Sequence, residues 1–218
     1  MGKIGLFGGT FDPVHNGHIA VAQEAKKRLC LDKIILIPAG DPPHKTQKKV
    51  TQKQHRLRMT ELAFEPFDGY EISDYEIRKN TPSYSVDMIR HFHETFAGSE
   101  LFFIIGADSF ADLPSWWHYR ELLSLCSIIV VSRPDTEKSD LLADFSGDEE
   151  APRVFFLDNL HMDISSTQIR AMVYHGQDVT AFVPETVCRY IQENRLYKEQ
   201  ESFTKEIDGW NSHTCRKN

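Results

Sequence analysis

The chain has 218 residues, of which 40% are hydrophobic and 26% charged, a composition typical of a globular domain. Its formal net charge of −7 argues against nucleic-acid binding driven by overall charge, and no apolar stretch approaches the length that crosses a membrane. Four scattered cysteines form no Cys-x-x-Cys motif, and the N-terminus has no signal-peptide pattern. We therefore expect a cytoplasmic protein with neither a nucleic-acid nor a membrane partner.

Apolar runs typical of strands alternate along the chain with helical patterns. The strong strand candidates are Lys3–Phe7, Lys33–Pro38, Leu101–Ile105 and Ser127–Ser132, and the weaker ones are Tyr70–Ile72 and Val154–Leu157. Helices are predicted at Ile19–Leu29, Gln54–Phe64, Ser85–Phe96, Tyr119–Leu125, Ser166–His175 and Pro184–Glu193. Ser83 or Ser85 is expected to cap the third helix, Ser165 or Ser166 the fifth, and Pro184 to occupy a first helical position. The alternation predicts an α/β fold built on a doubly wound parallel sheet.

Two segments fall outside this alternation. The stretch Arg133–Pro152 holds seven acidic residues and is predicted to be an irregular acidic insert at 134–152, within one domain that covers residues 1–197. The polar tail at 198–218 is predicted to be a C-terminal extension, either a short docked helix or a frayed end.

The first candidate site lies where the first strand meets the first helix. Glycines at Gly8 and Gly9 let the backbone approach a phosphate, and the free N–H groups of the following helix point toward it. His15 and His18 are three residues apart, so a helix would place both on one face, where they could donate to phosphoryl charge. An ordinary turn with packed histidines is the alternative. A metal pair is another, although zinc-binding helices favour an i,i+4 spacing.

Two further segments have the chemistry of a nucleotide site. Gly106 and Asp108 follow a buried strand, and the strand order 3-2-1-4-5 would bring them opposite Gly8 and Gly9; Asp108 could then hold a ribose or simply cap a helix. Near the C-terminus, Ile164-Ser165-Ser166-Thr167 starts a helix and Arg170 follows one turn later. Its hydroxyls and guanidinium could hold outer phosphates, and a plain capped helix is the alternative.

Positive charge is concentrated in one stretch of this acidic chain. From Pro42 to Thr60 there is no Asp or Glu, and the stretch carries six Lys and Arg residues. A solvated face explains Lys48 and Lys49 best, whereas a functional role is favoured for Lys45.

Taken together, these motifs resemble the bacterial nicotinate-mononucleotide adenylyltransferase family, in the nucleotidyltransferase superfamily with the His-x-Gly-His motif. The matching segments are Gly8–His18, Pro42–Lys45, Pro82–Ser85, Phe103–Asp108, Leu113–Trp116, Ser132–Pro134, Ile164–Arg170 and Val183–Tyr197. They cover nearly the whole chain up to Tyr197. The resemblance implies a Rossmann-like fold and an enzyme that joins ATP and nicotinate mononucleotide, releasing pyrophosphate, in NAD biosynthesis.

The resemblance also implies roles for individual residues. The catalytic ones would be His15, His18, Lys45 and Arg170. Those that bind ATP would be Gly8, Gly9, Thr10, Phe11, His15, His18, Gly106, Asp108, Ile164, Ser165, Ser166 and Arg170. Those that bind the mononucleotide would be Thr10, Lys45, Ser85, Trp116, Trp117 and Arg133. Trp116 would stack on the nicotinate ring and Ser85 would meet its carboxylate; the family usually has Thr at position 85 and often Tyr at position 117.

The chemistry needs no protein nucleophile, because the phosphate of the mononucleotide can attack the α-phosphorus of ATP directly. The histidines are expected to be protonated among the phosphates, and Mg²⁺ is expected to enter with ATP rather than at a dedicated protein site. Another acceptor, such as nicotinamide mononucleotide or phosphopantetheine, is an alternative, and so is a regulator that binds nucleotide without turnover. The oligomeric state stays open, with a homo-oligomer among the options.

Overall fold

A computed structural model describes residues 2–40, 50–79, 84–132, 145, 152–158 and 164–198 of the chain. In this part of the chain, six strands form one sheet in the order β3-β2-β1-β4-β5-β6, and every neighbouring pair is parallel. The strands are β1 (Lys3–Gly9), β2 (Lys33–Pro38), β3 (Tyr70–Ile72), β4 (Glu100–Gly106), β5 (Ser127–Val131) and β6 (Val154–Leu157). The predicted order is confirmed and extended by β6, and both weaker strand candidates are strands.

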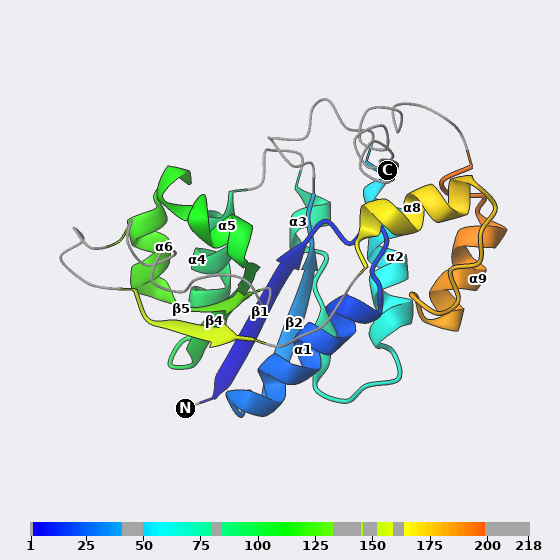
Figure 1. Ribbon diagram of the computed structural model, residues 1–218. Helices are drawn as coiled ribbons and strands as arrows, with labels where there is room; N and C mark the ends of the chain where they lie inside the picture. The colour runs from blue at the N-terminus through cyan, green and yellow to red at the C-terminus, as the bar shows by residue number, and fades with distance from the viewer. Residues whose placement is uncertain are drawn as a thin grey trace, which may run out of the picture.

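Helices cover both faces of the sheet (Figure 1). One face carries α1 (Asn16–Arg28), α2 (Lys53–Phe64), α8 (Ser166–Tyr174) and α9 (Glu185–Glu193). The other carries α4 (Ser85–Thr95), α5 (Ala107–Ala111), the 3₁₀ turn η1 (Leu113–Ser115) and α6 (Tyr119–Leu125). The short helix α3 (Tyr75–Arg78) follows β3. Among the described residues, no helix combines the length and the apolar character that crossing a membrane requires.

The apolar runs of the central strands explain this two-faced packing. Successive side chains of a strand point to opposite faces, so a run without polar residues must be covered on both sides. In β2, Ile34 and Leu36 pack against the face with α1 and α2, whereas Ile35 and Ile37 pack against the face with α4. The same alternation divides β4 between the two core clusters. The doubly wound sheet therefore follows from the strand composition.

The structure corrects several details of the predicted elements. The helices α3 and α5 and the turn η1 were not predicted, because three to five residues are too few to show a helical period. Ser85 is the first residue of α4 and Tyr84 is its N-cap, so the capping role expected of Ser85 is wrong; Ser83 lies outside the described residues. Ser165 does cap α8, and its hydroxyl accepts from the Gln168 N–H at 3.2 Å. Pro184 is the N-cap of α9 rather than its first residue.

Arg56 ties the loops around β1 and β2 to helix α2. Although it belongs to the basic stretch of the sequence, its side chain is only 1% exposed. The guanidinium donates to the carbonyls of Thr51, Thr10 and Gly40, each at 2.9 Å. A buried carbonyl that loses its donor costs roughly 1–3 kcal/mol, so this one side chain stabilises the polypeptide around Thr10.

We predict that Arg56→Met lowers the free energy of unfolding by about 3–5 kcal/mol, because one buried and two part-buried carbonyls lose a charged donor together. Arg58→Met is the matched control on the same helix. Arg58 is half exposed and pairs with Glu61, so its loss is expected to change stability by no more than about 0.5 kcal/mol. Denaturant unfolding measures both variants. Equal stability of the two variants would contradict a bonding role for Arg56.

Candidate active site

A pocket opens at the carboxyl edge of the sheet, where the winding direction reverses between β1 and β4. Its volume is about 260 Å³. In a doubly wound sheet this is the place where ligands bind. The lining combines the ends of three strands with α3, α4, α5 and the loop after η1: Phe7, Gly8, Gly9, Ile37, Ala39, Glu76, Tyr84, Ser85, Met88, Phe103, Ile105, Gly106, Ser109 and Trp116. A mostly apolar wall with few polar groups suits a flat ring.

The two predicted histidines lie together at the start of α1. His15 is the N-cap, and its backbone N–H donates to Nδ1 of His18 at 3.2 Å. The ring centroids are 3.8 Å apart, and Phe11 packs edge-on against His18 at 5.0 Å. Nδ1 of His18 is thus an acceptor, which leaves Nε2 to carry the proton of the neutral ring. The spacing argument correctly placed the two imidazoles side by side, although His15 precedes the helix.

Burial sets the charge of this pair. Desolvation lowers the pKa of His15 to about 4. Desolvation and the adjacent His15 lower the pKa of His18 well below 6.5. Both rings are therefore neutral at pH 7 in this structure. The expected protonation among phosphates depends on a bound polyphosphate, whose negative charge would raise the pKa of the nearby imidazoles.

The turn between β1 and α1 owes its shape to Phe11. Phe11 has a φ of 49° and is buried, and its ring folds back over Gly9. A Cβ on Gly9 would come within 2.8 Å of that ring. A side chain at Gly9 would therefore require the buried Phe11 ring to move, and the expected close approach of this glycine to a phosphate stays a prediction. At Gly8, by contrast, a Cβ would make only ordinary van der Waals contact with Phe103 and Met88.

The second predicted motif docks directly on the first. The Ser166 hydroxyl donates to the carbonyl of Pro13 at 2.9 Å, and Nη1 of Arg170 donates to the carbonyl of Asp12 at 2.7 Å. Ser165 contributes differently, because its hydroxyl is engaged in the capping box with Gln168. The structure therefore brings Arg170 and Ser166 to the turn that carries His15, as the phosphate-site hypothesis requires. Half-buried Ile164 packs below them on the core.

Asp12 is a site residue that the sequence analysis missed. It is 4% exposed, and both of its carboxylate oxygens accept hydrogen bonds. Oδ1 accepts from the Tyr197 hydroxyl at 2.7 Å and Oδ2 from the Thr51 N–H at 3.1 Å. A Phe-Asp-Pro turn shows only that a turn exists, and the distant partners cannot be read from local sequence. Asp12 anchors the turn to two remote parts of the chain.

The mononucleotide side of the pocket holds Ser85 and Trp116. Trp116 lines the pocket, whereas Trp117 is 64% exposed and lies 6.2 Å from the ring of Tyr84. The structure thus places Trp116, and not Trp117, where a ring could stack. Ser85 also lines the pocket, in the first turn of α4.

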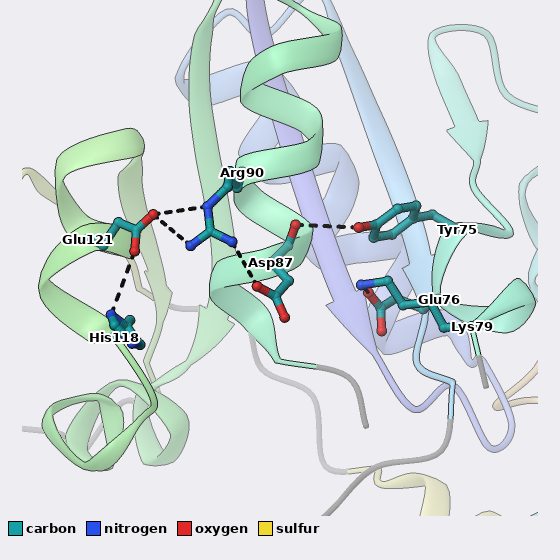
Figure 2. A network of polar contacts seen from close by, with 7 residues as sticks. All are labelled: Tyr75, Glu76, Lys79, Asp87, Arg90, His118 and Glu121. Atoms are coloured by element: carbon teal, nitrogen blue, oxygen red, sulfur yellow. Dashed lines mark hydrogen bonds and ion pairs between the residues drawn. The ribbon is translucent and has the colours of Figure 1, made fainter. Parts of the chain in front are cut away.

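A polar network joins α4 to α6 (Figure 2). Arg90 donates to Asp87 at 2.8 Å and, from two nitrogens, to Glu121 at 2.7 and 3.0 Å. His118 lies 3.7 Å from the same Glu121. Ser85 starts α4, and Trp116 lies between η1 and α6, so the two expected ring contacts belong to the elements that this network joins.

Glu76 is a second residue that the sequence analysis missed. Its carboxylate belongs to the pocket lining, is 4% exposed, and lies 3.2 Å from Nζ of Lys79 through Oε1 (Figure 2). Oε2 is buried and has no hydrogen-bond partner among the described residues. Lys79 also lies over the ring of Tyr75, at 4.1 Å. The pair places a carboxylate and its counter-charge beside a largely apolar pocket, and the sequence held no signal for it beyond an acidic residue after a short strand.

The remaining predicted residues divide into two groups. Gly106 is the N-cap of α5 and lines the pocket, while Asp108 is exposed in the first turn of that helix and does not cap it. Lys45 and Arg133 lie outside the described residues, as does most of the 134–152 insert and the tail after residue 198. Among the described residues, no group of three or more His, Cys, Asp or Glu side chains could hold a metal ion. The entry of Mg²⁺ with ATP therefore stays a prediction.

Known proteins match this chain along most of its length. The cytidylyltransferase-like family model matches residues 6–172. A Clostridium botulinum (strain Eklund 17B / Type B) protein named "Probable nicotinate-nucleotide adenylyltransferase" is 42% identical over 202 residues, which cover 92% of this chain and 100% of the relative.

Two solved structures have a similar fold. They are the Plasmodium falciparum nicotinic acid mononucleotide adenylyltransferase complexed with NaAD, with TM-score 0.74 and 19% identity, and the same enzyme complexed with APC, with TM-score 0.73 and 17% identity. Each alignment covers 92% of this chain and 99% of that chain. At such low identity the likeness bears on the fold alone.

The neutral histidine pair predicts a pH dependence of stability. The pKa of His15 falls from 6.5 in the unfolded chain to about 4 in the folded one, so the unfolded state binds more protons between these values. The stabilisation is present above pH 6.5 and is lost as the pH falls. His15 alone should lower the free energy of unfolding by about 2 kcal/mol between pH 7 and pH 5. His15→Gln should lose less stability over that range in denaturant titrations; an identical loss in both proteins would contradict the burial of a neutral imidazole.

Proposed function

Because the chain belongs to the cytidylyltransferase-like family, and within it to the nicotinate-nucleotide adenylyltransferases, we propose that it transfers the adenylyl group of ATP to nicotinate mononucleotide. The products are nicotinate adenine dinucleotide and pyrophosphate, in a step of NAD biosynthesis. One observation carries the assignment to this site: Ser166 and Arg170 bond to the turn that leads into His15. Phosphate-binding groups from both ends of the chain thus meet at one sheet edge.

The substrates are assigned to the two sides of this edge by the chemistry of the side chains. The triphosphate lies against His15, His18 and Arg170, which supply N–H donors and one fixed positive charge. The nicotinate ring enters the apolar pocket beside Trp116, and its carboxylate meets Ser85 at the start of α4. Asp108, exposed at the end of β4, takes the ribose of ATP, and Lys45 and Arg133 supply further positive charge.

Catalysis on this arrangement is positioning and electrostatic stabilisation. The mononucleotide phosphate attacks the α-phosphorus, the bond to the β-phosphate oxygen breaks, and pyrophosphate leaves with that electron pair. His15 and His18 donate to the oxygens on which charge develops, and their burial in a site of low polarity strengthens each bond. Mg²⁺ enters the site bound to the phosphates of ATP and belongs to that substrate.

The cellular location and the oligomeric state of the enzyme are two further points that experiments can address. A cytoplasmic location is expected from the cysteine usage, and the described cysteines Cys30, Cys126 and Cys188 are unpaired. Cell fractionation tests the location, and sedimentation tests the oligomeric state.

Removal of one histidine tests the catalytic role directly. We predict that His18→Ala lowers kcat by about 10²–10³, equivalent to roughly 3–4 kcal/mol, with a much smaller change in KM, because the lost donor acts mainly on transition-state charge. His93→Ala, an exposed substitution on α4, is the control and should keep wild-type kinetics. A folded His18→Ala protein with near wild-type kcat would remove the catalytic claim.

The choice of acceptor tests the function against its alternatives. Nicotinate and nicotinamide rings have nearly the same shape, so stacking cannot separate them. A hydroxyl at Ser85 and free N–H groups at the start of α4 favour two acceptor oxygens over an amide NH₂. Glu76 also lines the pocket, and Lys79 pairs with one of its carboxylate oxygens, which offsets its negative charge. We predict that nicotinate mononucleotide is preferred by at least roughly a hundredfold in kcat/KM.

Pyrophosphate release from ATP and Mg²⁺ is measured with nicotinate mononucleotide, nicotinamide mononucleotide and phosphopantetheine in turn. Ser85→Ala should erode the acid preference, whereas Trp116→Ala should weaken both pyridine substrates together. Equal use of the two mononucleotides would indicate a dual-specificity enzyme. Faster turnover with phosphopantetheine would identify phosphopantetheine, and not nicotinate mononucleotide, as the acceptor. No turnover with any of the three would favour a regulator that binds nucleotide without catalysis.

A further inference from the structure

A hydrogen bond from the end of the described chain reaches the active-site turn. The Tyr197 hydroxyl donates to Oδ1 of Asp12 at 2.7 Å, across 185 residues of sequence. The other carboxylate oxygen is already occupied by the Thr51 N–H. Burial and the Asp12 carboxylate raise the pKa of Tyr197 well above its ordinary value of 10, so the hydroxyl stays a donor at neutral pH.

The backbone around Tyr197 adopts an unusual conformation. Arg195 and Tyr197 have φ values of 50° and 63°, in the left-handed region that bulky side chains rarely adopt. The two left-handed residues turn the chain back after α9, and the Leu196 N–H bonds to the carbonyl of Ile191 at 3.0 Å. Strained backbone of this kind persists where the surrounding contacts fix it, and such residues cluster at functional sites.

Asp12, which accepts the bond from Tyr197, also bonds to Arg170. The backbone carbonyl of Asp12 accepts the bond from Nη1 of Arg170, so the carboxylate and the carbonyl of one residue join Tyr197 to the guanidinium. We propose that Tyr197 is a positioning residue for adenylyl transfer, which holds Asp12 so that its carbonyl aims Arg170 at the phosphates. This proposal rests on the proposed function, because its assay is adenylyl transfer. The hydrogen bonds of Tyr197 and Arg170 to Asp12 do not depend on that function.

A matched pair of substitutions separates positioning from packing. Tyr197→Phe keeps the ring that packs on the core and removes the hydroxyl, which bonds to Asp12 and also makes a weak contact with Sδ of Met59 at 3.9 Å. Tyr190→Phe is the control: it removes a hydrogen bond between the Tyr190 hydroxyl and Nδ1 of His55, 2.9 Å apart, which joins α9 to α2. Both variants are expected to unfold at similar temperatures. Only Tyr197→Phe should lower kcat, by about tenfold, since a misplacement near 1 Å can cost up to a hundredfold.

A cycle with Arg170→Ala tests the path of the effect. If Tyr197 acts through Arg170, Tyr197→Phe should cost less than about twofold in kcat once Arg170 is already removed. A full tenfold loss in that background would overturn the path. In wild type, KM for the mononucleotide should change by less than about twofold in Tyr197→Phe, because the ring pocket is untouched.

Two truncations complete the test. A chain ending at Tyr197 should keep kcat within about twofold of the full chain, whereas one ending at Leu196 should lose as much as Tyr197→Phe. An inactive or insoluble chain ending at Tyr197 would show that residues 198–218 belong to the working fold and would overturn Tyr197 as the last required residue. A full-length protein without turnover counts against the proposed function. An active one in which Tyr197→Phe and Tyr190→Phe behave alike counts against Tyr197.

Discussion

Two backbone carbonyls, those of Asp12 and Pro13, hold the two halves of the site together. Arg170 and Ser166 bond to them across 158 and 153 residues of sequence. Such distant contacts require a rigid frame, and the parallel sheet supplies it by fixing β1 at its centre. Without these bonds the N-terminal motif and α8 would have no fixed relation, and the proposed catalysis by positioning depends on that relation.

The electrostatics of the site follow from burial in an acidic chain. With a net charge of −7, the protein cannot attract a polyphosphate by its overall field, so donors must be placed locally. Desolvation keeps the imidazoles of His15 and His18 neutral in the folded protein. In the proposed mechanism a bound polyphosphate offsets this desolvation, which couples the protonation of the pair to binding. Fixed positive charge is then the proposed role of Arg170, whose guanidinium bonds to the carbonyl of Asp12.

The sequence was sufficient for features that are local or periodic and insufficient for those that are distant. Continuous apolar runs predicted the central strands, and the glycine after β4 predicted the pocket edge. The spacing of His15 and His18 predicted their contact. The packing of Phe11 over Gly9 could not be predicted, nor could the bonds from Tyr197 to Asp12 and from Arg56 to three carbonyls, because each depends on segments that meet only in the fold. Short helices such as α3, which carries Glu76, also lack a readable period.

The proposed reaction is a single displacement at the α-phosphorus without a protein nucleophile. Hydrogen-bond donors hold the attacking and leaving groups in line. The most direct measurement is the stereochemical course of the reaction with the Sp isomer of adenosine 5′-O-(1-thiotriphosphate) and nicotinate mononucleotide, followed by assignment of the configuration at phosphorus in the dinucleotide product. Direct attack by the mononucleotide phosphate predicts inversion. Retention would require a second displacement through an adenylylated side chain and would contradict the account.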